Sequence, residues 1–122
     1  MIDFKNGLVI KMALMNTIPE DLSAILLQGE QVIGVYGGLR DYVAFTDKRI
    51  ISVNVQGFTG KKKDYTTLPY SKIQAFSVET AGTFDLDCEL ELYFSGLGKV
   101  KFEFTGRSNI VAIGRTISSY VL

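Results

Sequence analysis

The side chains that could do chemistry in this chain are carboxylates, amines and hydroxyl groups, because the sequence contains no histidine and a single cysteine, Cys88. Histidine is the commonest general base and the commonest metal ligand in proteins. One cysteine allows neither an intrachain disulfide nor a usual zinc site. These absences argue against an enzyme, and we expect no catalytic residue, no cofactor and no metal ion.

Acidic residues gather between positions 79 and 91, where they could form paired carboxylates or hold a divalent ion. Catalytic carboxylates need a concave, partly dry pocket that separates their pKa values, and nothing in the sequence predicts one. The segment 84–87 also lacks the spacing of an EF-hand. We expect most of this group to be the solvated face of a strand; its members are Glu79, Asp85, Asp87, Glu89 and Glu91.

Basic residues form a second candidate group, which could bind phosphate or lipid headgroups. The chain has 13 basic and 13 acidic residues and a formal net charge of 0. This balance gives no long-range attraction to an anion, and it does not favour nucleic acid as a partner. We expect a solvated loop tip, with an anionic partner as the alternative; the candidate residues are Lys48, Arg49, Lys61, Lys62 and Lys63.

A period of two residues starts at position 31 and predicts a series of strands. The last two strands alternate most clearly. Leu90 and Leu92 point inward, and a three-residue turn sets them opposite the inward group Val100, Phe102 and Phe104. The same turn should bring Glu91 near Lys101 or its neighbours. Cys88 alternates inward as well, which favours an inert core thiol. The expected strands are 32–36, 40–46, 49–55, 64–68, 73–80, 87–94 and 99–104.

Helical patterns flank these strands. Residues 1–16 fit an apolar helical stripe loosely. They form either a short helix or arm packed on the domain, or a hydrophobic arm that docks on a neighbouring molecule or a membrane surface. Thr17 and Glu20 resemble a capping box and predict a short amphipathic helix over 19–28. A C-terminal helix should begin after a cap at Ser108 or Asn109. Its buried stripe contains Ile110, Ile113, Gly114, Ile117, Tyr120 and Val121, and Gly114 suggests close approach to the sheet.

The order of these elements predicts a mainly β (α+β) fold, because no βαβ rhythm appears. We expect a seven-stranded antiparallel curved sheet or partial barrel, capped by a C-terminal α-helix and preceded by a short N-terminal helix. Residues 1–16 form the arm or helix, and 17–122 form a single domain. The longest apolar run, 8–15, contains Lys11 and is too short to span a bilayer, so we expect a cytoplasmic protein.

Several contiguous strings resemble the bacterial pleckstrin-homology (PH) domain family. They are Phe45–Ile51, Thr59–Lys62, Leu68–Ile73 and Phe76–Asp87, and the ending Ser118–Leu122 is similar as well. The resemblance spans roughly residues 30–122. It implies a PH-like, seven-stranded barrel-like sheet with a C-terminal helix and ring-shaped homo-oligomers, often with five-fold symmetry. For most members it implies no established catalytic activity or ligand.

Two loops bear on which ligand or partner this chain could bind. Eukaryotic PH domains bind phosphoinositides through basic residues between their first two strands, whereas the matching segment 37–40 holds one cation, Arg40. The loop 79–85 is rich in small and polar residues and lies in a family-like string. It is either an ordinary loop or an interaction patch for another protein, with candidate residues Glu79, Thr80, Thr83 and Asp85.

The leading functional hypothesis is a non-catalytic interaction module. It assembles into a homo-oligomeric ring, for example a pentamer, and binds an unidentified protein partner through a polar surface patch. The alternative is a peripheral membrane or lipid-headgroup binding module that uses the N-terminal apolar arm and the Lys61–Lys63 loop. In that case the protein would be membrane-peripheral.

Overall fold

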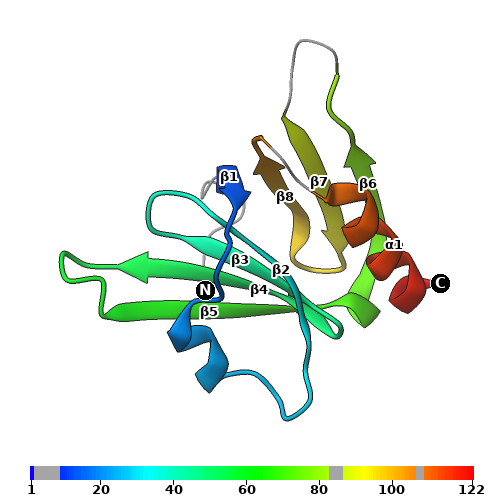
Figure 1. The fold of residues 1–122 in the computed structure, drawn as a ribbon. Helices are drawn as coiled ribbons and strands as arrows, with labels where there is room; N and C mark the ends of the chain where they lie inside the picture. The colour runs from blue at the N-terminus through cyan, green and yellow to red at the C-terminus, as the bar shows by residue number, and fades with distance from the viewer. Residues whose placement is uncertain (2–8, 83–86, 107–108) are drawn as a thin grey trace.

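The computed structural model describes residues 1, 9–82, 87–106 and 109–122 of the chain. Its described elements are mostly strands, with two short 3₁₀ helices between them and one regular α-helix at the C-terminal end (Figure 1). In chain order they are β1 (Val9–Leu14), the 3₁₀ helix η1 (Glu20–Ala24), β2 (Val32–Gly37), β3 (Tyr42–Thr46), β4 (Arg49–Gln56), β5 (Lys62–Pro69), the 3₁₀ helix η2 (Tyr70–Lys72), β6 (Ile73–Glu79), β7 (Cys88–Phe94), β8 (Gly98–Phe104) and α1 (Ile110–Val121).

The described strands form one curved sheet of eight strands, in the order β5-β4-β3-β2-β1-β8-β7-β6. β1 lies in the middle and joins the two halves: it is antiparallel to β2 and parallel to β8. The other neighbouring pairs are antiparallel. The mainly β fold with a C-terminal helix is therefore confirmed. The expectation of seven antiparallel strands is wrong, because the sheet has an eighth strand and is mixed.

The additional strand, β1, lies within the residues expected to form an arm or short N-terminal helix. The apolar spacing of Val9, Met12 and Met15 fits a helical face loosely, but long-range pairing decides the conformation. The N–H of Met15 donates to the carbonyl of Val35 at 2.8 Å, and the N–H of Thr105 donates to that of Met12 at 2.8 Å. These bonds satisfy backbone groups that a helix would have paired locally.

The helix expected over 19–28 is a 3₁₀ helix of five residues, η1. The capping box is not formed: Pro19 occupies the cap position, and no side chain accepts a hydrogen bond there. Leu22 nevertheless is buried, as the apolar spacing predicts. Ile25 and Leu26, which follow η1, are partly buried against the same cluster as Leu22, so this face is covered without a longer helix.

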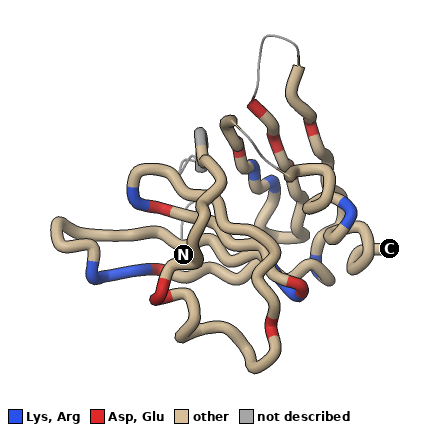
Figure 2. Tube along the Cα trace, viewed as in Figure 1, with Lys and Arg blue, Asp and Glu red and all other residues tan. Residues whose placement is uncertain are grey.

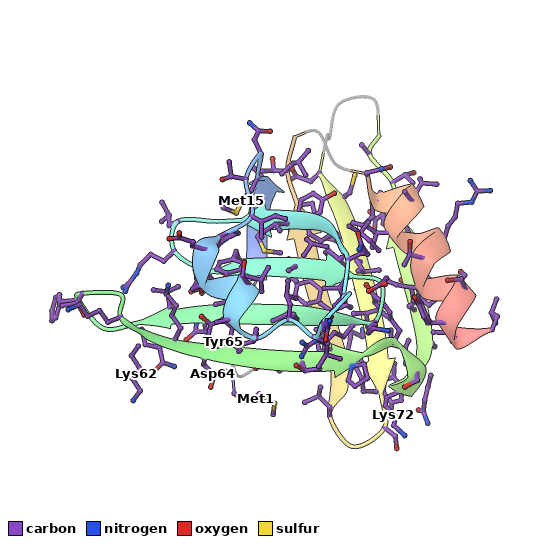
Figure 3. The ribbon with its side chains drawn as sticks, turned by 60° about the horizontal axis from the view of Figure 1, so that its bottom comes forward. Met1, Met15, Lys62, Asp64, Tyr65 and Lys72 are labelled. Carbon is purple, nitrogen blue, oxygen red and sulfur yellow. The ribbon has the colours of Figure 1, made fainter. Side chains whose placement is uncertain are left out.

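Apolar residues cover both faces of the β2–β5 half of the sheet. The main core includes Val43, Phe45 and Ile50, together with residues of β7, β8 and α1. Alternate residues of the same strands form a second cluster on the opposite face. There η1 covers the sheet, lying between the labelled Met15 and Tyr65 in Figure 3. The second cluster contains Leu22, Val35, Tyr42, Ala44, Ile51 and Val53.

The β7–β8 hairpin has the predicted register. Leu90 lies opposite Phe102, and Leu92 lies opposite Val100. These four side chains are buried, as is Phe104. The local alternation was sufficient here because a one-residue slip would expose the whole apolar set.

The C-terminal helix α1 packs beside β6 and η2 (Figure 1). Its predicted stripe is confirmed at Ile110, Ile113, Gly114 and Ile117, which are buried, but not at Tyr120, which is 46% exposed in the last turn. A Cβ atom on Gly114 would lie 3.0 Å from Cγ2 of Val78, which confirms the close approach to the sheet. The side chain of Asn109 makes no cap hydrogen bond, contrary to one of the two expected caps. Ser108, the other, lies outside the described residues.

Candidate interaction surface

The candidate interaction patch lies at the end of β6 that leads into the β6–β7 connection. Glu79 is the last residue of β6, and both Glu79 and Thr80 are exposed. The other two residues of the predicted patch, Thr83 and Asp85, lie outside the described residues. The patch is therefore only partly placed, although its described half is open to solvent as an interaction surface requires.

Charged side chains form a paired row on the outer face of β7 and β8. Lys101 Nζ lies 3.3 Å from Oε2 of Glu89 and 3.9 Å from Oε1 of Glu91. The pairing of Glu91 with Lys101 is confirmed, since the two residues are also cross-strand partners. The hydrogen bond to Glu89 raises the pKa of Lys101. Lys99 Nζ lies 3.8 Å from Oε2 of the same Glu91.

This row of charges ends beside the candidate patch. Glu79 is the cross-strand partner of Glu89, so two carboxylates occupy directly opposite positions. Like charges placed opposite each other destabilise a sheet slightly. Lys101 compensates the charge of Glu89, and the carboxylate of Glu79 adds negative potential at the end of β6. The arrangement suits contact with a basic group of a partner.

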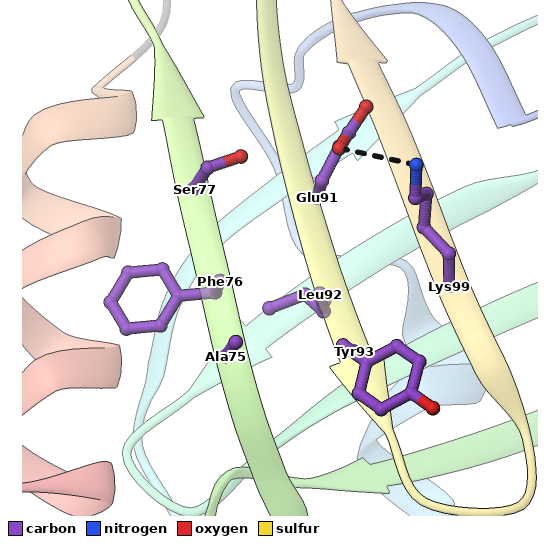
Figure 4. Close-up of a pocket in the computed structure, with 7 residues that line it drawn as sticks. All are labelled: Ala75, Phe76, Ser77, Glu91, Leu92, Tyr93 and Lys99. Atoms are coloured by element: carbon purple, nitrogen blue, oxygen red, sulfur yellow. Dashed lines mark ion pairs between the residues drawn. The ribbon is translucent and has the colours of Figure 1, made fainter.

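A shallow hollow lies next to these residues on the outer face of β6 and β7. Its volume is about 190 Å³, which is below the usual size of a pocket that encloses a small molecule. Tyr93 is the large exposed aromatic residue at its rim, with 48% of its surface accessible. Figure 4 shows the residues that line it: Ala75, Phe76, Ser77, Glu91, Leu92, Tyr93 and Lys99. Tyrosine is frequent in protein–protein interfaces, so this hollow fits a protein contact better than a bound metabolite.

The candidate basic residues do not lie together. Lys61 and Lys62 are exposed at the start of β5, whereas Lys48 and Arg49 lie at the opposite end of the β4–β5 pair. The eight-residue strand β4 separates the two sets by about 23 Å, at roughly 3.3 Å per residue. Lys63 is half-buried and lies 3.4 Å from Oδ1 of Asp21. The five residues therefore cannot form one anion site within this chain.

Arg49 has a structural partner, the buried carboxylate of Glu30. Arg49 Nε donates to Oε2 of Glu30 at 3.0 Å, and Nη2 donates to Oε1 at 3.0 Å. Thr46 Oγ1 and the N–H of Leu27 donate to the same carboxylate, at 2.7 and 2.9 Å. Hydrogen bonding from Arg49 lowers the pKa of Glu30 to about 2, although burial of the carboxylate opposes this shift. Arg49 thus neutralises a buried charge rather than facing a ligand.

The carboxylate of Asp21 connects η1 to the sheet through hydrogen bonds. The hydroxyl groups of Tyr42 and Tyr65 both donate to Oδ2 of Asp21, at 2.8 and 2.7 Å. Burial and the bond to Asp21 raise the pKa of Tyr65 to about 12. Burial alone would raise the pKa of Asp21, but the two hydroxyl groups and Lys63 lower it overall. Both tyrosines are committed to this contact, which leaves neither as a catalytic acid or base.

The described residues contain no group of three or more histidine, cysteine, aspartate or glutamate side chains that could hold a metal ion. Cys88 is buried, as its inward alternation predicts. In the part of the chain that the structure describes, no helix has the length and apolar character needed to cross a membrane. Residues 2–8 of the predicted N-terminal arm (1–16) lie outside the described residues, so their docking elsewhere stays a prediction, whereas residues 9–14 of the arm form β1.

The fold and these surfaces agree with a comparison to known families. The family model for the bacterial PH domain matches residues 3–121. The chain belongs to the bacterial PH domain family. This family membership confirms the resemblance inferred from the sequence, and it extends the match nearly to the N-terminus.

Similar proteins share both the length and the fold of this bacterial PH domain. The uncharacterised protein YjqA of Bacillus subtilis strain 168 is 42% identical over 120 residues, which are 95% of this chain and 96% of that protein. A crystal structure of a DUF1696 family protein with a PH domain from Shewanella loihica PV-4 is 39% identical, with a TM-score of 0.76 over 93% of this chain and 99% of that one. A PH domain structure from Shewanella amazonensis SB2B is 44% identical, with a TM-score of 0.61 over 84% and 83% of the two chains.

One surface feature was missed by reasoning from the sequence. Leu39 and Phe58 are fully exposed at the tips of two neighbouring turns. The signal was present in the glycines around them, since Gly38 precedes Leu39 and Gly57 precedes Phe58. An apolar residue within a glycine-rich turn has no strand or helix face to bury it.

Proposed function

We propose that this bacterial PH domain is a non-catalytic interaction module that assembles into a homo-oligomeric ring and binds another protein through the polar patch at the end of β6. One observation carries the proposal: within the described residues the curved sheet does not close, and β5 and β6 remain its two edge strands. Edge strands present unpaired backbone groups that favour pairing with another chain.

The edge strand β6 carries few of the features that protect an edge from pairing. It has seven residues, and its sequence contains no charged residue before Glu79. Ala75 and Ser77 are small and exposed. Its one irregularity is a shift of register between Ile73 and Ala75. On the side away from β7, β6 has no further strand among the described residues, and α1 packs beside it.

The opposite edge strand, β5, differs in character. It begins with Lys62, Lys63 and Asp64, and it ends at Pro69, which cannot donate a backbone hydrogen bond. Contact between two unlike edges is heterologous, and heterologous contacts form closed rings when the rotation between subunits is a simple fraction of a turn. Pairing β6 of one subunit with β5 of the next would leave no open edge in the assembly.

The polar patch would be repeated around such a ring. Glu79 and Thr80 lie at the end of the proposed pairing strand, so each subunit junction would carry one copy of them. Repetition converts a weak single contact into stronger multivalent binding. A partner with basic groups would complement the carboxylate of Glu79, which lies opposite Glu89.

Lysine substitutions on the edge strand test the assembly. We expect the double variant Ala75→Lys/Ser77→Lys to reduce the mass measured by size-exclusion chromatography with light scattering, because lysines on an edge strand oppose pairing. The control is Gln28→Lys, which adds one charge at an exposed position outside the sheet. An unchanged mass in the double variant, with the wild type oligomeric, would exclude β6 as the pairing strand. A monomeric wild type would exclude the ring.

A further inference from the structure

Two neighbouring turns form one protruding tip at the end of the sheet. The β2–β3 turn contains residues 38–41, and the β4–β5 turn contains residues 57–61. Arg40 joins them, since its Nη2 donates to the backbone carbonyl of Gly57. In Figure 1 the β4–β5 hairpin extends past the rest of the sheet, with the β2–β3 turn beside it.

An apolar side chain stands at the tip of each turn. The relative exposure of Leu39 is 105%, and that of Phe58 is 110%. Among the large hydrophobic residues that the structure describes, Leu122 alone is comparably exposed, at 102%, and it is the last residue of the chain. Single exposed apolar residues are common on protein surfaces. Here two fully exposed residues stand on turns that a hydrogen bond joins, so we treat them as one apolar surface.

The β4–β5 turn is shaped to hold Phe58 outward. Gly57 and Gly60 have positive φ angles of 75° and 68°, a conformation that favours glycine. A Cβ atom on Gly60 would also lie 3.3 Å from Cγ1 of Val55. The turn thus closes tightly behind Phe58, and the phenyl ring has no neighbouring surface on which to fold back.

Cationic side chains surround these two apolar residues. Arg40, Lys61 and Lys62 are exposed, and Figure 2 shows basic segments in both hairpins at this end. The two carboxylates nearest in sequence are already engaged. Asp41 Oδ1 accepts the N–H of Val55 at 2.8 Å, and Asp64 Oδ2 lies 2.8 Å from the amino group of Met1. The two segments of the tip thus carry the cations Arg40, Lys61 and Lys62 against the single carboxylate of Asp41, so the tip is locally positive on a chain whose net charge is 0.

We propose that this tip, residues 38–41 and 57–62, docks on a membrane surface that contains anionic lipids. Leu39 and Phe58 enter the interface between headgroups and acyl chains, and Arg40, Lys61 and Lys62 lie against lipid phosphates. The tip is convex, so a fluid bilayer can accept it without a complementary pocket. This inference goes beyond the proposed interaction module. Each can fail without the other, because the tip shares only Lys62 with the proposed pairing strand β5, and β6 lies at the other edge of the sheet.

A single tryptophan can report the insertion directly, because the sequence contains none. We expect the fluorescence of Phe58→Trp to shift to the blue on addition of vesicles of phosphatidylglycerol and phosphatidylcholine, and to become protected from iodide quenching. The matched control is Leu122→Trp, which places tryptophan at an equally exposed position away from the tip and should show no shift. Vesicles of phosphatidylcholine alone should give a much weaker response.

Loss of binding tests the apolar and the basic parts separately. In vesicle co-sedimentation the variant Leu39→Ser/Phe58→Ser should bind on the order of tenfold more weakly, because two apolar side chains no longer leave water. Lys61→Gln/Lys62→Gln should also weaken binding by about tenfold and reduce its dependence on salt. Leu122→Ser should bind like the wild type. All these positions are exposed, so the thermal midpoint of each variant should match that of the wild type.

Several results would overturn the proposal. One is the absence of wild-type binding to phosphatidylglycerol vesicles. Another is binding in which Phe58→Trp does not shift, which would place the contact elsewhere on the chain. A blue shift that grows with protein concentration without vesicles would show instead that a second copy covers the tip.

Discussion

At the scale of single residues, the ion pair of Arg49 with the buried carboxylate of Glu30 links segments that are far apart in the chain. Glu30 precedes β2, and Arg49 begins β4. Arg49 Nη2 also donates to the carbonyl of Ile25 at 2.8 Å, and Nη1 donates to Thr67 Oγ1 at 2.9 Å. The pair therefore connects the η1 segment to three strands through charge-assisted hydrogen bonds.

We expect Glu30→Gln to lower the free energy of unfolding by about 3 kcal/mol, because it leaves the guanidinium of Arg49 partly buried without an opposite charge. The NH₂ group of the new glutamine would also face an N–H donor of Arg49, where a carboxylate oxygen now accepts. Urea unfolding followed by circular dichroism measures the change. Glu20→Gln, at an exposed position of η1, is the control and should be neutral.

The same pair predicts an acid dependence of stability. The folded-state pKa of Glu30 is about 2, below its ordinary value of 4.5. The charged carboxylate is thus favoured by folding, and its stabilisation is complete above about pH 4.5 and lost as the pH falls toward 2. The loss amounts to about 3 kcal/mol for a shift of this size. In urea titrations at decreasing pH, the difference between the wild type and Glu30→Gln should shrink over this interval; a constant difference would contradict the assignment.

At the scale of elements, the contact between α1 and β6 fixes how the helix sits on the sheet. Gly114 allows the helix backbone to approach Val78. We expect Gly114→Leu to destabilise the protein by about 2 kcal/mol, because the new side chain overpacks this contact. The double variant Gly114→Leu/Val78→Ala should recover part of the loss in thermal unfolding. Val111→Leu, on the exposed side of α1, should change little.

The elements that the sequence predicted correctly are those with a local pattern. The β7–β8 hairpin alternates strictly, and the stripe of α1 repeats at helical spacing, so each is encoded within a few consecutive residues. β1 was missed because it pairs in parallel with β8, about ninety residues away, and a local period does not reveal such a partner. η1 was expected to be longer because its cap and apolar residues fit an α-helix equally well.

For the candidate sites as well, features encoded in a few consecutive residues were predicted, and features set by long-range contacts were not. Glu79 and Thr80 were placed correctly as exposed residues at the end of a strand. The basic residues were grouped by composition, whereas the length of β4 separates Arg49 from Lys61. Neither the bond of Arg49 to Glu30 nor that of Arg40 to Gly57 could be predicted, since each joins turns whose spatial order depends on the complete sheet.

At the scale of the whole molecule, the open sheet links the fold to the proposed assembly. Within the described residues, β5 and β6 follow each other in the chain but do not pair, because the η2 segment turns the chain between them. A PH-like barrel that stays open at this corner retains two edges. A second subunit can satisfy their backbone groups without any change in the fold of the first.

The tip and the β6 edge would then act together. In a closed ring every subunit has the same orientation relative to the axis, so all copies of the tip would lie at one height. Several weak insertions at one membrane surface strengthen binding through effective concentration. We expect the Ala75→Lys/Ser77→Lys variant to bind phosphatidylglycerol vesicles more weakly than the wild type although its tip is unaltered, as co-sedimentation can show. Equal binding would mean that docking does not depend on assembly.

The most direct test of the central claim is the mass of the native wild-type particle. Native mass spectrometry at micromolar concentration should give one dominant species whose mass is a fixed multiple of the 13.5 kDa chain. That species should persist over a range of protein concentrations, as expected for a closed ring. A spectrum that contains only the 13.5 kDa monomer would contradict the proposed assembly.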